Sequence, residues 1–221
     1  MFWTLGLAHL IADYPLQTDG LVRAKRHWHG LALHVLAHLA TMILLCGMDS
    51  LVIWPALVAL AIAHLVIDAS KTVTSARWPE RVVVPYIVDQ IVHIASIVLV
   101  AGWIEARYGV RRDQPWMLIA AAYLSVTHVW YITERVVAHR DPSFQEVAQT
   151  HHWSRMIVRG LALTVYLLGA ALLAPRNAIA APALISALSS LPYRDALYGR
   201  RMLVLDLLGP LIIAAIALVL R

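Results

Sequence analysis

The sequence has few cysteines and few charges. Cys46 is the single cysteine among 221 residues, so the chain can form neither an internal disulfide framework nor a thiolate metal cluster of its own. Charged residues make up only 14% of the chain and hydrophobic residues 61%, whereas soluble domains average about 25% charged and about 45–50% apolar residues. This composition, with a mean hydropathy of +0.71, excludes a disordered chain and predicts an integral membrane protein.

The formal net charge is +5, a basic balance that nucleic-acid-binding proteins often have. Here, however, the basic residues lie between long apolar runs. That pattern is typical of loops that flank membrane-spanning helices. We therefore expect no nucleic-acid partner.

Long apolar runs predict an all-α fold, a polytopic transmembrane bundle of seven to eight helices. A hydrocarbon core of about 30 Å requires about 20 helical residues. An eighth run at 178–191 is short and contains Pro182, and we favour a span there over a re-entrant or surface segment. The seven clearest runs cover residues 3–17, 31–47, 51–69, 82–104, 116–138, 157–174 and 203–220.

Basic residues are unevenly distributed between the two sides of this predicted bundle. If all eight runs span, the loops on one side, with their helix ends, hold 13 of the 18 Lys and Arg residues. The positive-inside bias places these loops in the cytoplasm, although the basic segment 107–112 on the other side opposes this assignment. Arg23, Lys25 and Arg26 lie in the first cytoplasmic loop and are expected to be plain membrane anchors.

Ionisable residues interrupt the first four runs in pairs four residues apart. On an α-helix such residues project from one face, and ionisable groups inside a bilayer mark functional sites by default. All of them lie toward the helix ends next to the basic loops, so we expect them at one depth in the cytoplasmic leaflet. The pairs are His9 with Asp13, His34 with His38, His64 with Asp68, and Asp89 with His93.

The four pairs repeat with a constant offset. Adding 55 to positions 9, 13, 34 and 38 gives 64, 68, 89 and 93. This predicts that residues 1–48 and 56–104 are two copies of one helical hairpin, related by a pseudo-two-fold axis along the membrane normal. Residues 1–104 would then carry the site, and residues 105–221 would be a scaffold or the surface of a homo-oligomer. Glu134 interrupts an apolar run without matching the repeat.

Five imidazoles and three carboxylates, without a thiolate, predict a site for one or two divalent metal ions. Mixed nitrogen and oxygen ligation suits Zn²⁺, Fe²⁺ or Mn²⁺, of which we favour zinc. A lone intramembrane His or Asp is often only a helix–helix hydrogen-bond partner, but eight in a repeated register favour a metal or proton site. The predicted metal ligands are His9, Asp13, His34, His38, His64, Asp68, Asp89 and His93.

The candidate catalytic residues are Asp13, Asp89 and Lys71. Either carboxylate could act as the base beside an activated water. Lys71 lies three residues after Asp68 on the same side of its helix, where it could hold an anionic head group or only extend to the membrane interface.

Two glutamines lie next to the pairs. Gln17 continues the stripe of His9 and Asp13 and, with Lys71, is expected to contact the substrate. Gln90 follows Asp89 but points about 100° away from it on a helix, so it is given little weight in the predicted site.

These motifs resemble a bacterial family of small integral membrane proteins known as domain of unknown function 3307. The resemblance covers about the first 105 residues and implies a location in the bacterial cytoplasmic membrane, but no activity. More distantly, H-L-x-x-D in a membrane helix is similar to predicted membrane-bound metal-dependent hydrolases, which favours hydrolysis by analogy. The shared motifs are H-L-x-x-D-x-x-x-Q from His9, H-x-x-x-H from His34, H-x-x-x-D-x-x-K from His64 and D-Q-x-x-H from Asp89.

The predicted function is a membrane-embedded, metal-dependent hydrolase of a lipid or lipid-linked ester or phosphoester at the cytoplasmic leaflet. One alternative is a divalent-cation or proton-coupled transporter, because inward-facing His and Asp side chains at a repeat interface are typical of such proteins. The other is a non-haem di-iron membrane oxidoreductase. It is disfavoured because only His151-His152 is similar to the H-x-x-H-H patterns of membrane desaturases.

Overall fold

The computed structural model describes residues 1–137 and 139–172. These residues form helices and turns, with no strand among them, as expected for an all-α protein. The chain divides after Leu124 into two compact units, one covering Met1–Leu124 and one beginning at Ser125. The predicted division of roles, a site-bearing core and a scaffold, stays a prediction.

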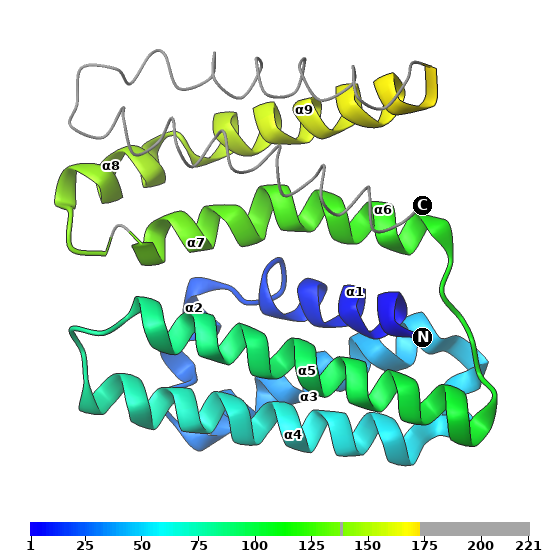
Figure 1. Cartoon of the computed structure of the whole chain (residues 1–221). Coiled ribbons are helices and arrows are strands. Elements are labelled where there is room, and N and C mark those ends of the chain that lie inside the picture. Colours follow the sequence, from blue (N-terminus) through cyan, green and yellow to red (C-terminus); the bar gives the residue numbers. More distant parts are fainter. Residues whose placement is uncertain (138, 173–221) are drawn as a thin grey trace. The chain divides into compact units, whose positions relative to one another are not determined.

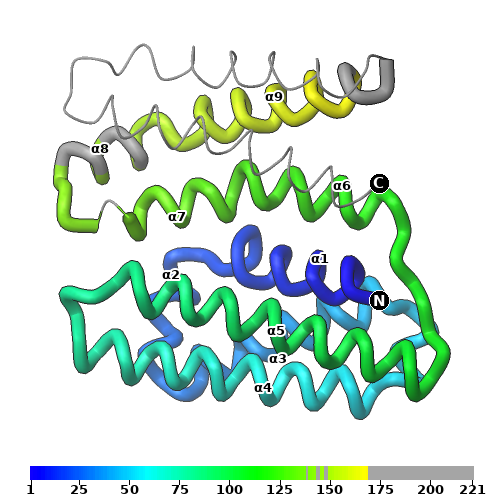
Figure 2. The backbone as a smooth tube through the Cα atoms, in the orientation of Figure 1, coloured from blue at the N-terminus to red at the C-terminus, as the bar shows by residue number. Residues whose placement is uncertain are grey.

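Four helices of the first unit close into a bundle (Figure 1). Helix α1 packs against α3 and α5, and α4 also packs against α3 and α5. Figure 2 shows α4 and α5 running side by side and joined by a short turn. Helix α6 packs on the outside of this bundle, against α1. The helices of the unit are α1 (Phe2–Asp13), α2 (Asp19–Ala24), α3 (Trp28–Cys46), α4 (Ser50–Arg77), α5 (Val83–Tyr108) and α6 (Pro115–Leu124).

Apolar side chains fill one half of the bundle. They come from the beginnings of α1 and α4 and from the ends of α3 and α5, so the four helices alternate in direction. The opposite half contains the four ionisable pairs. The buried core consists of Met1, Leu5, Ala8, Met42, Cys46, Ile53, Ala56, Leu57, Leu60, Ala61, Ile97, Ala101 and Ile104.

A glycine turn reverses the chain between α3 and α4. Gly47 has a φ of 56°, which a residue without a Cβ adopts at little cost. The turn is held by Arg112, whose guanidinium donates to the Leu45 carbonyl at 3.1 Å and to the Asp49 carboxylate at 2.8 Å. As a result α4 packs back on α3.

Three helical segments are long and apolar enough to cross a membrane, namely Trp28–Arg77, Val83–Tyr108 and Pro115–Val137. The first contains both α3 and α4. Large apolar side chains point outward from these segments, among them Leu44 at 78% and Leu99 at 73% exposure. Soluble proteins rarely expose apolar surface on this scale, so the fold is compatible with an integral membrane protein.

The structure has six long helices among its described residues, not the seven to eight expected. They are α1, α3, α4, α5, α9 (His152–Leu172) and one continuous helix made of α6, the π-helical turn η2 (Ser125–Val129) and α7 (Trp130–Val137). The runs expected at 178–191 and 203–220 lie outside the described residues. Helix α8 (Pro142–Thr150) is short.

Helix α1 is also shorter than the span expected at residues 3–17. It has 12 residues and ends at Asp13. Tyr14 caps the helix with its backbone N–H on the Leu10 carbonyl, and the next residue, Pro15, has no N–H with which to continue the helical hydrogen bonds. Asp13 is therefore the last residue of α1.

In the second unit, α9 packs against η2 and α8. Glu134 of α7 is only 2% exposed and accepts hydrogen bonds from Arg155, at 2.8 Å, and from Arg159. Both arginines lie on α9. The ion pair thus links α7 to α9 and gives the Glu134 carboxylate two permanent cations.

Candidate metal centre

The first bundle gathers all eight predicted ligands in one place, which we call the His/Asp cluster. Their exposed fractions range from 0% for His34 to 8% for Asp13. Three overlapping groups of these side chains have ligand atoms within 4.8 Å of one another. Each helix contributes one pair: His9 and Asp13 from α1, His34 and His38 from α3, His64 and Asp68 from α4, and Asp89 and His93 from α5.

The tightest group contains Asp13 and three histidines. Asp13 Oδ1 lies 3.0 Å from His34 Nε2, 2.9 Å from His38 Nε2 and 3.8 Å from His64 Nε2. The imidazoles also approach one another, because His34 Nε2 is 3.2 Å from His38 Nε2 and 3.1 Å from His64 Nε2. Three ring nitrogens and one carboxylate oxygen therefore converge on a single point.

Hydrogen bonds alone cannot account for the close contacts among these four side chains. A neutral imidazole nitrogen carries one proton or one lone pair, yet His34 Nε2 has three polar neighbours within 3.2 Å. Nitrogen and oxygen ligands bound about 2.0–2.1 Å from one ion lie about 2.9–3.4 Å apart. The spacings around His34 match those of ligands that share a metal ion.

A second group consists of His9, His64 and His93. Within the described part of the chain, the Nε2 atoms of His9 and His93 make no hydrogen bond, and the carboxylate oxygens of Asp13 and Asp89 lie 3.5 Å and 3.4 Å from them. A buried polar atom without a partner costs about 1–3 kcal/mol. A cation between these rings would give both nitrogens a partner.

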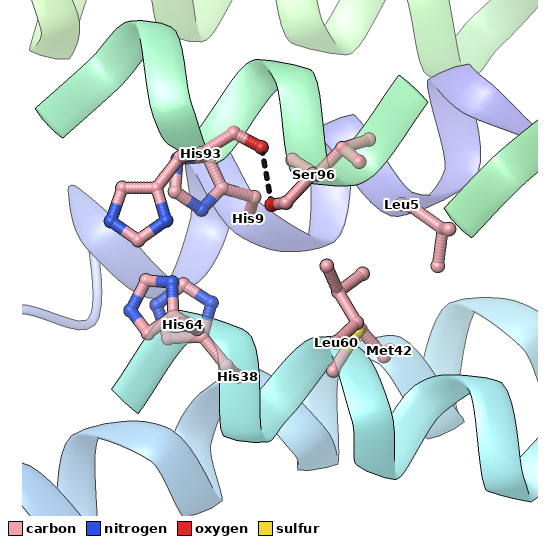
Figure 3. Close-up of a pocket in the computed structure, with 9 residues that line it drawn as sticks. Leu5, His9, His38, Met42, Leu60, His64, His93 and Ser96 are labelled. Carbon is pink, nitrogen blue, oxygen red and sulfur yellow. Dashed lines mark hydrogen bonds between the residues drawn. The ribbon is translucent and has the colours of Figure 1, made fainter. Parts of the chain in front are cut away.

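A small cavity opens beside these rings (Figure 3). Figure 3 shows the imidazoles of His9, His64 and His93 gathered on one side of it and the aliphatic side chains of Leu5 and Leu60 on the other. The cavity thus lies at the boundary between the His/Asp cluster and the apolar half of the bundle.

The third group contains Asp68, Asp89 and His93. His93 Nε2 lies 3.5 Å from Asp68 Oδ1 and 3.4 Å from Asp89 Oδ1. Asp89 Oδ1 makes no hydrogen bond to any described residue. This group joins the first through Asp68, whose Oδ2 is 3.4 Å from His34 Nε2.

Two lysines neutralise carboxylates at the edge of the cluster. Lys71 Nζ donates to Asp89 Oδ2 at 2.7 Å, so it contacts a carboxylate of the neighbouring helix. Lys25 Nζ lies 2.5 Å from Asp68 Oδ2 and donates to Gln17 Oε1 at 2.7 Å. Gln17, which was expected beside the cluster, contacts it only through Lys25.

Lys25 was expected to be a plain membrane anchor, and this expectation is wrong. The first turn of α3 packs directly on the chain segment that carries Lys25, because a Cβ on Gly30 would lie 2.1 Å from the carbonyl of Ala24. This contact holds Lys25 over the cluster. A glycine at the start of an apolar helix was the one signal in the sequence that such a contact was present.

Gln90 and Tyr14 also contact the site, although Gln90 was expected to contribute little and Tyr14 was not predicted as a site residue. Gln90 Nε2 donates to Asp89 Oδ2 at 3.0 Å, and Tyr14 Oη donates to Gln90 Oε1 at 3.2 Å. The Gln90 side chain bends back toward Asp89 although its Cα faces away. These two residues fix the orientation of the Asp89 carboxylate.

A cavity of about 610 Å³ lies beside the cluster. Three cations line it, namely Lys25, Arg26 and Lys71, together with Asp68 of the cluster and the hydroxyl of Thr72. Asp68 therefore separates the candidate metal centre from a basic cavity that is large enough for a small organic molecule.

Charge balance distinguishes the metal-free site from the loaded one. Two of the three carboxylates of the cluster are paired with lysines, Asp68 with Lys25 and Asp89 with Lys71. One divalent ion held by neutral imidazoles would then leave an excess charge of about +1, and two ions about +3. A buried excess of positive charge requires an anion, so a loaded site would attract one.

The fold and the cluster define a class, a helical bundle with buried histidines and aspartates positioned as metal ligands. Comparison with family models shows which family this chain is similar to: residues 1–110 match the family described as protein of unknown function, DUF3307. This match supports the resemblance stated from the motifs and covers the bundle and its site. A search of curated proteins and a search of solved structures found no match.

Proposed function

We propose that this chain is an integral membrane hydrolase that uses one or two divalent metal ions and acts on a lipid or lipid-linked ester or phosphoester at the cytoplasmic leaflet. The observation that carries the proposal is the convergence of three imidazole nitrogens and the Asp13 carboxylate. The basic cavity next to this point supplies room for a substrate.

The roles proposed for the metal, Asp13 and Asp89 follow from the contacts that each side chain already makes. A divalent ion held by the histidines would supply Lewis acidity and a water activated near neutral pH. Asp13 contacts imidazoles only and acts as a ligand. Asp89 is held at Oδ2 by Lys71 and Gln90, while its Oδ1 makes no hydrogen bond to a described residue. That oxygen is therefore placed to accept a proton from water.

The position of the basic residues supports the cytoplasmic leaflet. Lys25, Arg26 and Lys71 line the cavity at the cluster end of the bundle, and Arg77 ends α4 on the same side. The positive-inside bias assigns such an end to the cytoplasm.

The apolar half of the bundle disfavours the transporter. Below the cluster, Leu5, Ile53 and Leu57 are each at most 1% exposed and belong to one packed core. A carrier needs polar groups along its path, and in the described bundle this apolar core separates the His/Asp cluster from the polar groups of Met1, Thr4 and Asp113 at the other end. The di-iron alternative gains no specific support from the site.

The proposal includes the internal duplication. In this account α1 with α3, and α4 with α5, are two copies of one hairpin offset by 55 residues. The copies are used unequally, since His64 belongs to two ligand groups and its counterpart His9 to one. Zinc remains the metal we expect, on the basis of the donor set.

The test is product release from a bacterial membrane lipid extract by the purified, detergent-solubilised protein. We expect soluble or lipid product by mass spectrometry, loss of product after chelation, and recovery on adding Zn²⁺, Fe²⁺ or Mn²⁺. Asp89→Asn should abolish release, whereas Asp113→Asn, a carboxylate outside the cluster, should retain it.

The same preparation separates the alternatives. Metal-dependent flux of a divalent ion into proteoliposomes, without product release from lipid, would support the transporter and contradict the hydrolase. Equal release by the wild type and by Asp89→Asn would contradict the assigned base.

A further inference from the structure

A second, mostly aliphatic cavity lies between α4 and α5. It measures about 230 Å³ and is lined by the apolar residues Val66, Ile67, Pro85, Val88 and Val92, together with Ser70 and Thr74. Its inner end is polar, because Lys71 and Asp89 also line it. The outer side chains are half-exposed, with Val88 at 52% and Val92 at 42%, so the cavity opens sideways on the outer surface of the bundle.

Lys71 connects this groove to the basic cavity. Its side chain lines both spaces, and its Nζ donates to Asp89 of the His/Asp cluster. On one side of Lys71 lie Lys25, Arg26 and the hydroxyl of Thr72. On the other side lies an aliphatic groove in a helix pair that is apolar enough to span a membrane.

The two spaces together match one kind of molecule. Ammonium and guanidinium groups are typical ligands of phosphate. An aliphatic groove that opens toward lipid suits an acyl chain, which could enter sideways without crossing water. The excess positive charge of a metal-loaded cluster adds to the attraction for an anionic head.

We propose that the substrate of the hydrolase proposed above is an anionic, phosphate-bearing membrane lipid. Its phosphate lies in the basic cavity against Lys25, Arg26 and Lys71, and one acyl chain lies in the groove between α4 and α5. That this lipid is a substrate rests on the proposed function, whereas its binding to the two cavities does not depend on turnover.

Binding to metal-loaded protein in detergent tests the inference with three probes. The first is a non-hydrolysable phosphonate lipid with two eight-carbon chains. The second, methylphosphonate, has the head without chains, and the third, dioctanoylglycerol, has the chains without the head. We expect the phosphonate lipid to bind more tightly than either of the others.

Variants then separate the two cavities. Lys71→Gln should weaken the binding of the phosphonate lipid and of methylphosphonate by about tenfold each, because it removes one charge-assisted contact. Val88→Trp should fill the groove and weaken the binding of the phosphonate lipid by about tenfold, and the affinity for methylphosphonate should not change. Ile91→Trp is the matched control, since Ile91 is 60% exposed on the same helix outside the groove.

Val66→Trp fills the groove from α4 and replaces Val88→Trp if that variant does not fold, as judged by metal content. Equal lipid affinity in Val88→Trp and Ile91→Trp would overturn the acyl-chain assignment. Equal affinity for the phosphonate lipid and dioctanoylglycerol would overturn the phosphate assignment.

These outcomes differ from a failure of the proposed function. Tight phosphonate-lipid binding without hydrolysis of the corresponding phosphate lipid would remove the hydrolase and retain the ligand class. Metal-dependent hydrolysis of another ester by a protein that does not bind the phosphonate lipid would retain the hydrolase and remove the proposed ligand class.

Discussion

The protein buries carboxylates in two regions, and their counter-charges differ. In the second unit, Glu134 is paired with the guanidinium groups of Arg155 and Arg159, which remain charged at every physiological pH. In the first unit, Asp13 contacts imidazoles, which are neutral ligands when a metal binds. Asp68 and Asp89 of this unit also pair with lysines. The imidazoles beside its buried carboxylates, and not a lack of permanent cations, therefore distinguish the site that can take up an ion from the ion pair that links helices.

The largest expected effect is on metal content. His64 belongs to two of the three ligand groups, whereas His9 belongs to one. His64→Ala should therefore lose essentially all bound metal and activity, and His9→Ala should lose less. Metal-to-protein ratios by mass spectrometry measure this directly, with His128→Ala as a histidine control outside the cluster. Equal loss in His9→Ala and His64→Ala would instead favour two equivalent copies.

The second prediction concerns the arginine-paired carboxylate. Glu134→Gln removes a buried carboxylate that two buried guanidinium groups contact, which is expected to cost about 3–5 kcal/mol of folding stability. Metal content should stay at the wild-type value. Thermal unfolding and metal analysis of the same sample check the stability loss and the unchanged metal content. Metal loss in folded Glu134→Gln would contradict the distinction between the two regions.

A smaller effect is expected where the cluster meets the basic cavity. A methyl group in Gly30→Ala would lie 2.1 Å from the Ala24 carbonyl, so the segment that carries Lys25 must move. We expect about tenfold weaker binding of an anionic ligand, as for loss of one charge-assisted contact, with metal retained. Gly20→Ala has open space around its Cβ, with only the Thr18 hydroxyl within 4 Å, and serves as the control. Unchanged binding in Gly30→Ala would show that Lys25 is held by other contacts.

The smallest effect concerns a carboxylate at the opposite end of the bundle. Burial would raise the pKa of Asp113, but hydrogen bonds from the N-terminal ammonium and Thr4 outweigh it and lower that pKa below its usual value. Its stabilising contribution is present above the unfolded-state pKa and is lost as the pH falls through the lower folded-state value. Because the side chain is 30% exposed, Asp113→Asn should cost only about 0.5–1 kcal/mol near pH 7.

Thermal unfolding of the wild type and Asp113→Asn across pH 3–7 checks this prediction. The difference between the two proteins should shrink toward pH 3. A constant difference would mean that the carboxylate contributes through its shape and not through its charge.

Periodicity made the cluster predictable. Pairs four residues apart share a helix face whatever the tertiary structure is, so His34 with His38, or His64 with Asp68, had to project together once the helices formed. That the four faces turn toward one point was inferred from the repeat and is found in the structure. The length of the first helix was less predictable, because α1 ends at Asp13, two residues before Pro15.

Residues that reach the site from outside this pattern were not predictable. Lys25 lies in a short connection, and its direction depends on the close contact of Gly30 with Ala24. Gln90 reaches Asp89 only because its side chain is long enough to bend back. Such contacts depend on tertiary packing, which helical periodicity does not encode.

The most direct test of the central claim is the metal content of purified wild-type protein, measured beside the double variant Asp68→Asn/Asp89→Asn and the control Asp113→Asn. We predict one or two divalent ions per chain in the wild type and the control, and a clear loss in the double variant. A folded wild type that holds no divalent ion, even after incubation with Zn²⁺, Fe²⁺ and Mn²⁺, would contradict the assignment of the His/Asp cluster as a metal centre.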